Sequence, residues 1–428
     1  MSAILDPVAT GLARRVPGVR QIRRPATEIS PEFDLAYVRT RAGSGRYALP
    51  PAVVIPGGPG LGSILPYRFL RTIAARGGLD LIMVEHRGVG LSRTDPGGRD
   101  LPTSAMRITE VIDDIAAVLD HECVPQAYLV GSSYGSYLAS SFGVAHPGRV
   151  AGMLLDSALQ SADDLDIERS AVRELFWNST GERAAAVRQL AETGIDQRVL
   201  LDVVRAAFEL GGDELLLPLL QGRMRSACDP VWWALKAYAT RDASIPRLPG
   251  VYDFDLAGVI GFRELGYGAK PDGLPLDPAL TYAPLADRFP PFEGEPFDLA
   301  SGVRGFDWPV VLLSGTRDLR TPPPIAERVA AAAPNSVLMS IDKGHSALDT
   351  HPVAVLNALK WLIEGRQDEL PAAAARLDRL PLRGAAARFP LLLQAGLRVG
   401  QQRRRKWRRG GTGTRGNASS ERPRDRLK

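Results

Sequence analysis

Residues 127–135 read Ala-Tyr-Leu-Val-Gly-Ser-Ser-Tyr-Gly, an apolar run that ends in a Gly-x-Ser-x-Gly turn. A helix-like stretch, 134–145, follows directly, so the order is strand, sharp turn and helix. This order is typical of a nucleophile elbow, in which a serine lies at the tip of a strained turn and glycines keep Cβ atoms away from the neighbouring chain. Only Ser133 is centred between Gly131 and Gly135, and we predict that it is a nucleophile.

Two later loops supply the acid and the histidine that such a serine needs, in the chain order that the elbow motif leads us to expect. Asp318 follows the apolar run 308–313, and His345 follows the apolar run 336–341. Both residues therefore lie just beyond predicted strands, and we predict that they complete a catalytic triad. Asp156 is the alternative acid, because it also follows a strand-like run.

A glycine-rich loop supplies the second feature of acyl-transfer chemistry, a pair of N–H donors for a developing oxyanion. The residue after the nucleophile, Tyr134, provides one backbone donor. The strand-like run 52–55 opens into Pro-Gly-Gly-Pro-Gly at 56–60, where missing side chains let the backbone approach a carbonyl. We predict that Gly58 provides the second donor, with Gly57 as the alternative.

Three motifs together resemble the proline iminopeptidase family of α/β-hydrolases. They are Gly-Gly-Pro-Gly at 57–60, Glu-His-Arg-Gly-Val-Gly-Leu-Ser at 85–92 and the elbow at 131–135. The family usually shows H-G-G-P-G and D-x-R-G-x-G-x-S, so this chain departs from the pattern at Pro56 and Glu85. The resemblance implies a serine aminopeptidase whose substrate is a peptide or a small amino acid derivative.

The alternation of apolar runs with helix-like stretches, such as 134–145, 323–333 and 352–363, predicts an α/β fold, with a mostly parallel sheet covered by helices on both faces. The less apolar segments 20–24 and 33–39 are predicted to be antiparallel edge strands. The resemblance covers about residues 20–365 and implies the α/β-hydrolase fold with an inserted helical cap. We expect the hydrolase core to consist of residues 1–157 and 301–365, with the helical cap inserted between them at 158–300. Residues 366–428 are expected to form a basic, partly disordered tail.

The predicted cap contains an amphipathic helix over 182–210 and an aromatic-rich stretch around Trp232, which is either cap core or an apolar wall over the substrate. An aminopeptidase needs a carboxylate for the protonated amine of its substrate, because this charge pairing rejects internal peptide bonds. In the family that the chain resembles, such acids come from the cap. Glu264 is our first candidate, and Asp229 and Asp255 are the alternatives.

The basic character of the chain belongs to its last 63 residues. Residues 366–428 hold 17 lysines and arginines against 5 aspartates and glutamates, a net charge of +12; since the whole chain carries +5, residues 1–365 carry −7. The pI of 9.3 is therefore no argument for nucleic-acid binding, and we expect no nucleic-acid partner. The apolar residues near 389–399 and the cluster 403–409 predict either contact with an anionic membrane surface or a solvated tail with a short helix packed on the body. This region is too short and too charged to span a bilayer.

The remaining features exclude several other protein classes. Two cysteines far apart cannot form a disulfide framework, and the N-terminal residues lack an apolar signal core, so we expect a cytoplasmic protein. We expect no metal or cofactor, because the sequence has no metal-ligand spacing, dinucleotide fingerprint or phosphate loop. The alternatives to an aminopeptidase are an esterase or amidase of small apolar substrates on the same triad, and a catalytically silent binding protein.

Overall fold

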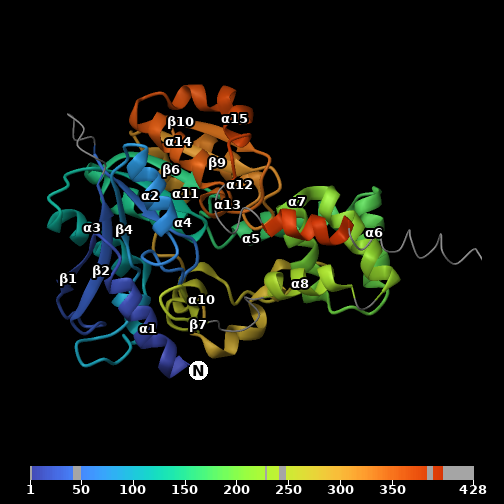
Figure 1. The fold of residues 1–428 in the computed structure, drawn as a ribbon, viewed down its shortest axis with the longest axis horizontal. Coiled ribbons are helices and arrows are strands. Elements are labelled where there is room, and N and C mark those ends of the chain that lie inside the picture. The colour runs from blue at the N-terminus through green and yellow to red at the C-terminus, as the bar shows by residue number, and fades with distance from the viewer. Residues whose placement is uncertain (1, 42–49, 227–228, 241–246, 383–388, 399–428) are drawn as a thin grey trace, which may run out of the picture.

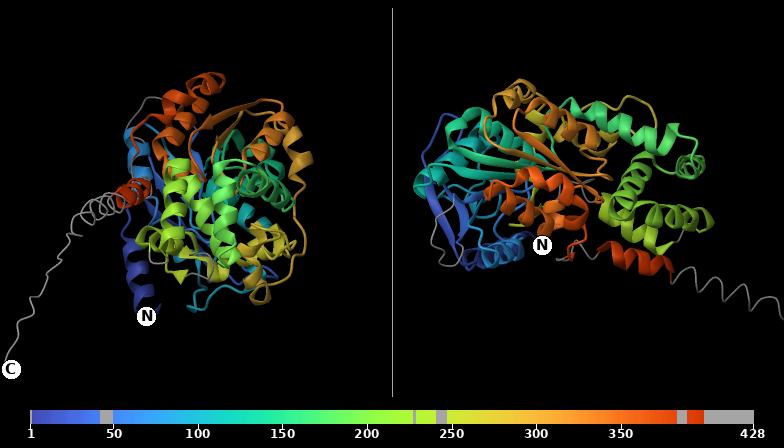
Figure 2. Two further views of the ribbon diagram at one scale, coloured as in Figure 1. Left: turned by 90° about the vertical axis from the view of Figure 1, so that its right-hand side faces the viewer. Right: turned by 90° about the horizontal axis from the view of Figure 1, so that it is seen from above.

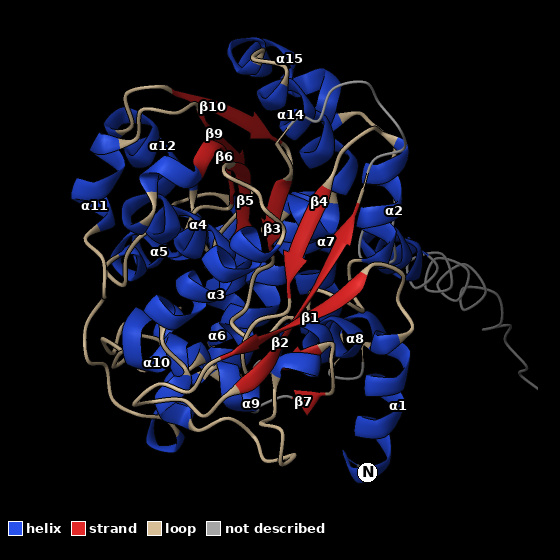
Figure 3. Cartoon of the chain, turned by 90° about the vertical axis from the view of Figure 1, so that its left-hand side faces the viewer, coloured by secondary structure: helices blue, strands red, loops and turns tan. Residues whose placement is uncertain are grey.

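The computed structural model describes residues 2–41, 50–226, 229–240, 247–382 and 389–398. Its main sheet has eight strands in the order β1-β2-β4-β3-β5-β6-β9-β10 (Figures 1 and 3). All neighbours from β4 to β10 are parallel, whereas β1 pairs antiparallel with β2 and β2 with β4. The antiparallel direction of the first two strands is as predicted, but only β1 is an edge strand, since β2 lies between β1 and β4. The strands are β1 (Val19–Arg24), β2 (Phe33–Thr40), β3 (Ala52–Ile55), β4 (Leu81–Val84), β5 (Ala127–Ser132), β6 (Val150–Asp156), β9 (Val310–Gly315) and β10 (Ser336–Ile341).

Helices cover both faces of this sheet. The helices of this part of the chain are α1 (Ser2–Arg14), α2 (Arg68–Arg76), α3 (Ile108–His121), α4 (Tyr134–Ala145), α12 (Pro323–Ala332), α13 (Ala347–Thr350), α14 (Pro352–Ile363) and α15 (Leu370–Asp378). Short 3₁₀ turns lie at Gly90–Ser92, Thr103–Ala105, Pro147–Arg149 and Gln367–Glu369. The helices predicted to begin at Tyr134, Pro323 and Pro352 are all present, and their ends agree with the prediction to within one residue.

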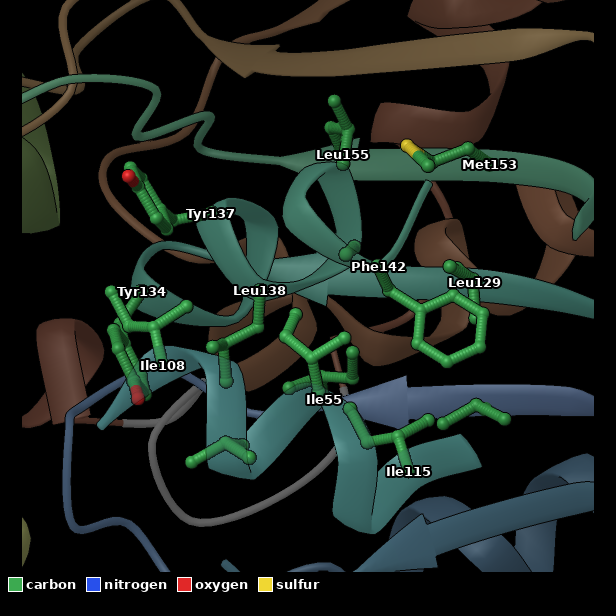
Figure 4. Packing of buried hydrophobic residues seen from close by; sticks show 14 of the residues in the cluster. Ile55, Ile108, Ile115, Leu129, Tyr134, Tyr137, Leu138, Phe142, Met153 and Leu155 are labelled. Atoms are coloured by element: carbon green, nitrogen blue, oxygen red, sulfur yellow. The ribbon is translucent and has the colours of Figure 1, made fainter. Parts of the chain in front are cut away.

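Alternate residues of each central strand pack on opposite faces, as the two-residue period of a strand requires. Leu129 of β5 packs in a cluster with α3, α4 and α12, whereas Val130 packs in a second cluster with α2, α14 and α15. Figure 4 shows the first cluster, with Ile115 of α3 and Phe142 of α4 close to Leu129. The near-continuous apolar strands of the sequence are therefore strands that are buried on both faces.

The chain between β6 and β9, which we call the insert, extends beside the sheet (Figures 1 and 2), while its residues Leu256, Ile260 and Leu299 pack in the first core cluster. Its helices are α5 (Asp164–Arg173), a π-helical turn (Glu174–Asn178), α6 (Glu182–Ala191), α7 (Gln197–Arg225), α8 (Pro230–Ala239), α9 (Phe254–Ala257), α10 (Val259–Leu265) and α11 (Leu299–Gly302). Strands β7 (Arg247–Leu248) and β8 (Tyr252–Asp253) form a hairpin, and 3₁₀ turns lie at Pro278–Thr281, Ala283–Arg288 and Val303–Gly305.

The helix predicted over 182–210 is wrong in its continuity. The structure has α6 and α7 in its place, because Gly194 adopts a left-handed conformation and Asp196 caps α7 by accepting a hydrogen bond from the Val199 N–H. α7 itself bends at Gly212, whose φ and ψ of 57° and −153° are not helical. Helices α6, α7 and α8 enclose an apolar core of their own.

The last described segment, 389–398, is helical and lies against the insert (Figure 2). Its Leu393 and Leu397 are buried in the apolar core of the insert, and Phe389 contacts the ring of Tyr238 with centroids 4.9 Å apart. The basic cluster 403–409 and Cys228 lie outside the described residues. Within the ranges given above, no helix is long and apolar enough to cross a membrane.

Candidate active site

The turn between β5 and α4 holds Ser133 in a strained conformation, with φ of 54° and ψ of −123°. The flanking glycines have no room for side chains. A Cβ on Gly131 would lie 2.2 Å from the Gly135 carbonyl oxygen, and one on Gly135 would lie 2.1 Å from the Ile55 carbonyl oxygen. The Ser133 N–H donates to the Asp156 carbonyl oxygen on the next strand at 2.9 Å. The elbow is therefore held between β3 and β6.

The structure brings together the three side chains that the sequence predicts as a triad. His345, in the loop after β10, has Nε2 2.9 Å from Ser133 Oγ and Nδ1 3.0 Å from both carboxylate oxygens of Asp318. Asp318, in the loop after β9, also accepts hydrogen bonds from Arg320 N, Thr321 N and Thr321 Oγ1. Because a carboxylate only accepts, Nδ1 carries the proton and Nε2 is left to accept one from the serine.

The charges at this site stabilise a positive imidazole. Burial lowers the pKa of His345, but the adjacent Asp318 carboxylate outweighs this effect and the net shift of that pKa is upward. Burial raises the pKa of Asp318, but His345 and the hydrogen bonds from the Thr321 backbone outweigh it and the net shift is downward. Asp318 therefore stays ionised beside the histidine. The arrangement is chemically able to move a proton from the serine hydroxyl to the imidazole.

Asp156, the alternative acid, serves a different part of the same loop. It accepts hydrogen bonds from Ser132 Oγ at 2.8 Å, Ala347 N at 3.1 Å and Leu348 N at 2.8 Å. Burial raises the pKa of its carboxyl to about 6. The structure thus places Asp318, and not Asp156, against the imidazole, while Asp156 holds the chain just after His345.

The glycine-rich loop lies next to the elbow, as predicted. Both Gly57 and Gly58 line the cavity that contains Ser133, and a Cβ on Gly57 would lie 3.4 Å from the Ser133 Cβ. Tyr134 is the first residue of α4, where backbone N–H groups lack acceptors within the helix. Its side chain points away to His86, whose Nε2 lies 3.0 Å from the Tyr134 hydroxyl. The choice between Gly57 and Gly58 as donor stays a prediction.

A cavity of about 680 Å³ opens over Ser133 and His345, between the sheet and the insert. Its apolar and aromatic wall includes Leu61, Leu159, Leu165, Leu248, Leu265, Tyr252, Tyr267 and Tyr282. Its charged wall includes Asp164, Glu168, Asp349, Arg205, Arg247 and Arg320. The described residues contain no group of three or more His, Cys, Asp or Glu side chains placed to hold a metal ion.

The predicted substrate-binding residues of the insert do not line this cavity. Glu264 is buried, and its Oε2 accepts a hydrogen bond from the Ile108 N–H at the start of α3. Trp232 is buried in the core of α6, α7 and α8. Asp229 caps α8, and Asp255 lies outside the cavity lining, where it pairs with Arg93 at 2.8 Å and with Arg247 at 3.7 Å. These positions do not support the expected roles, because tertiary packing turns each side chain toward another helix or loop.

Glu168 is one of three acidic cavity residues that the sequence analysis missed, the others being Asp164 and Asp349. It lies on α5, and its Oε1 accepts a hydrogen bond from Arg205 Nη1 at 2.6 Å. Its side chain is 15% exposed, and burial raises the pKa of its carboxyl to about 7. Asp164 and Glu168 are four residues apart on one helix and line the same cavity, so their spacing is the one signal in the sequence that could have found them.

A comparison with protein families agrees with this architecture. Residues 50–237 match the model of a family described as alpha/beta hydrolase fold. No curated protein sequence matches the chain.

Solved structures with which the chain shares similarity include a proline iminopeptidase of Mycobacterium smegmatis, with 15% identity, a TM-score of 0.49 and coverage of 81% of this chain and 99% of that one. Another is the esterase RhEst1 of Rhodococcus sp., with 19% identity, a TM-score of 0.45 and coverage of 81% of this chain and 98% of that one. A third is Est816, an N-acyl homoserine lactone degrading enzyme (18%, 0.46, 80% and 99%). The mixed sheet, the elbow and the matched family model together show that this chain has the α/β-hydrolase fold.

Proposed function

We propose that this protein is a serine hydrolase that acts through a covalent acyl-enzyme, and that its activity is that of an aminopeptidase. The observation that carries the proposal is the continuous set of hydrogen bonds from Ser133 through His345 to Asp318, at the floor of a cavity large enough for a short peptide. A buried carboxylate, a histidine and a strained serine in this order serve the two proton transfers of acyl transfer.

In the proposed mechanism, Ser133 Oγ attacks a substrate carbonyl while His345 Nε2 takes its proton. Backbone N–H groups of Gly58 and Tyr134 stabilise the oxyanion that develops. His345 then gives the proton to the leaving amine or alcohol, and Asp318 stabilises the imidazolium in between. Water repeats the same steps on the acyl-enzyme and releases the acid.

The aminopeptidase part of the proposal is supported by the resemblance of the three motifs and by Glu168. This carboxylate faces the cavity from α5, the first helix of the insert. In our proposal it takes the role expected of Glu264 and binds the protonated amine of the substrate, sharing its charge with Arg205.

One observation favours the alternative, an esterase or amidase of small apolar substrates. Each cavity carboxylate already has a partner inside the protein: Asp164 pairs with Arg328, Glu168 with Arg205, and Asp349 accepts from the Tyr67 hydroxyl. An uncharged substrate would displace none of these partners and would contact the leucines and tyrosines of the wall.

The test compares kcat/KM for proline anilide with a free amine, the same compound acetylated, and a short-chain ester. We expect the free amine to be cleaved at least about tenfold better than the acetylated form, roughly 1.4 kcal/mol of discrimination. Ser133→Ala should abolish activity, and Glu168→Gln should remove the preference. Glu174→Gln, at an exposed position just after the same helix, is the matched control and should retain it.

Two other outcomes would change the conclusion. Hydrolysis of esters alone, through Ser133, would identify an esterase and reject the amine-binding role of Glu168. Failure of a serine-directed phosphonate to label Ser133 in folded protein would reject catalysis and leave a binding protein.

A further inference from the structure

The loop after β3, residues 57–64, is bound by the hairpin of β7 and β8 from the insert. The Gly62 N–H donates to the Val251 carbonyl oxygen at 2.9 Å, and the Asp253 N–H donates to the Gly60 carbonyl oxygen at 2.8 Å. Leu61 and Tyr252 form an antiparallel bridge between these two bonds. The loop that carries the predicted oxyanion donor is therefore paired with the insert by backbone hydrogen bonds.

Asp253 holds this hairpin on the core. Its side chain is fully buried, and Oδ2 accepts hydrogen bonds from the Gly90 N–H and the Gly250 N–H, each at 3.0 Å. Its Oδ1 lies 3.4 Å from Arg93 and 3.4 Å from Arg247. One carboxylate thus joins the turn of the hairpin to the 3₁₀ turn that begins at Gly90. A neutral side chain at this position would leave Arg93 and Arg247 without the negative charge of Asp253.

The fit between loop and hairpin is tight on both sides. Gly60 has φ of +104°, and a Cβ there would lie 2.9 Å from the Phe254 N atom, so even a methyl group would push the hairpin away. Tyr267 of the insert donates from its hydroxyl to the Gly58 carbonyl oxygen at 3.3 Å. From the core side, Glu85 accepts from the N–H groups of Ser63 and Ile64 at 2.6 and 3.1 Å.

We infer that the hairpin of the insert positions the oxyanion loop, and that Asp253 is the positioning residue on which this depends. The inference rests on the acyl-transfer function proposed above. The same hairpin places Arg247, Leu248 and Tyr252 in the cavity wall. A substrate that contacts these side chains therefore stabilises the docked hairpin, and with it the geometry of the N–H donor at Gly58. Binding of the substrate and assembly of the oxyanion hole are coupled through one element.

The test measures Asp253→Asn against Asp255→Asn. Asp255 binds the same Arg93 at 2.8 Å and is 27% exposed; its carboxylate accepts no hydrogen bond from the backbone of the loop or the Gly90 turn among the described residues. We expect Asp253→Asn to lower kcat/KM about 10- to 100-fold, since a displaced donor loses part of what one donor supplies. The affinity of a trifluoromethyl ketone, whose adduct carries the oxyanion, should fall by the same factor. Asp255→Asn should change neither by more than about threefold.

A second variant approaches the contact from the loop. Gly60→Ala should give the same parallel loss of kcat/KM and of ketone affinity. Gly148→Ala is the control, because a Cβ on Gly148 meets no atom within 4 Å. The double variant Asp253→Asn with Gly60→Ala should lose little more activity than either single variant, because both changes disrupt the same contact between loop and hairpin. Thermal unfolding of each variant separates this effect from loss of the fold.

The outcomes that overturn the inference are distinct from failure of the proposed function. Unchanged ketone affinity in both Asp253→Asn and Gly60→Ala, with an active wild type, would reject the positioning role alone. Equal losses in Asp253→Asn and Asp255→Asn would also reject it, because the arginine network would then explain the effect. A wild type that hydrolyses no substrate and whose Ser133 reacts with no phosphonate would overturn both proposals. The readout uses any substrate that the wild type cleaves, so an esterase result leaves the test intact.

Discussion

At the scale of single residues, two buried carboxylates act on one loop in different ways. Asp318 contacts the imidazole of His345 and raises its pKa, whereas Asp156 binds the backbone of residues 347 and 348. A charge in contact with the ring stabilises its protonated form strongly, whereas Asp156 interacts with His345 only weakly and mainly fixes the position of the loop. The two carboxylates therefore make different predictions for the same substitution.

Asp318→Asn should lower kcat/KM by roughly 10³- to 10⁴-fold, because the imidazolium loses its partner and the tautomer of His345 is no longer fixed. The base must be neutral, and its pKa is raised above 6.5 in the wild type, so wild-type activity should fall as pH drops through a value above 6.5. In the variant this acid limb should move to lower pH. A pH profile of kcat/KM measures both effects. Asp156→Asn is the control and should move the limb much less. Identical limbs in wild type and Asp318→Asn would contradict the assignment.

At the scale of elements, the elbow depends on how closely α4 approaches β3. A Cβ atom on Gly135 would lie 2.1 Å from the Ile55 carbonyl oxygen and 2.5 Å from the Pro56 carbonyl oxygen. Both oxygens belong to backbone at the start of the glycine-rich loop, which cannot move without displacing that loop. The same close approach that orients Ser133 therefore also sets the distance to the oxyanion loop.

Gly135→Ala should lower the free energy of unfolding by about 2–3 kcal/mol, since the added methyl group overpacks a backbone contact. It should also remove most of the activity, because α4 and the oxyanion loop are forced apart. Urea unfolding and kcat/KM check the two effects. Gly148→Ala places the same methyl group in open space and should be neutral in both. Equal stabilities of the two variants would show that the elbow tolerates a wider spacing.

At the scale of the whole molecule, the chain returns from the core to the insert through its last described segment. Leu393 and Leu397 of segment 389–398 are buried in the insert, while Leu391 and Leu392 are 58% and 69% exposed. The residues up to 365 carry a charge of −7, and those after it carry +12. Exposed leucines followed by arginines suit the surface of an anionic bilayer, which attracts the basic residues and accepts the apolar ones.

We expect the full chain to cosediment with vesicles that contain phosphatidylglycerol and not with vesicles of phosphatidylcholine alone. Binding should weaken as NaCl rises, because salt screens the attraction of the basic residues. Leu391→Ser with Leu392→Ser should reduce binding several-fold. Leu274→Ser, at an equally exposed position of 58%, is the control and should not. Absence of binding to both vesicle types would favour the solvated tail with a helix packed on the body.

Much of the fold was predictable because its signals are local. The helices beginning at Tyr134 and Pro352 follow from apolar spacing and from proline at a helix start, and the parallel strands follow from short apolar runs. The continuous helix predicted over 182–210 failed at Gly194, where one left-handed residue outweighs the helical pattern around it. α1 was not predicted, because among its residues whose burial is described, 6–14, Ala13 alone is buried, in the second core cluster, which gives a weak apolar stripe.

By itself, the sequence determined that Ser133, Asp318 and His345 each follow a strand. Because parallel strands end at the same edge of a sheet, this was enough to predict that the three residues meet. Only the tertiary structure decided which carboxylates reach the cavity. Glu168 faces it and Glu264 does not, since the insert is packed by contacts between residues far apart in the sequence. The pairing of the oxyanion loop with β8 likewise joins segments about 190 residues apart, and no local pattern in either segment encodes such a contact.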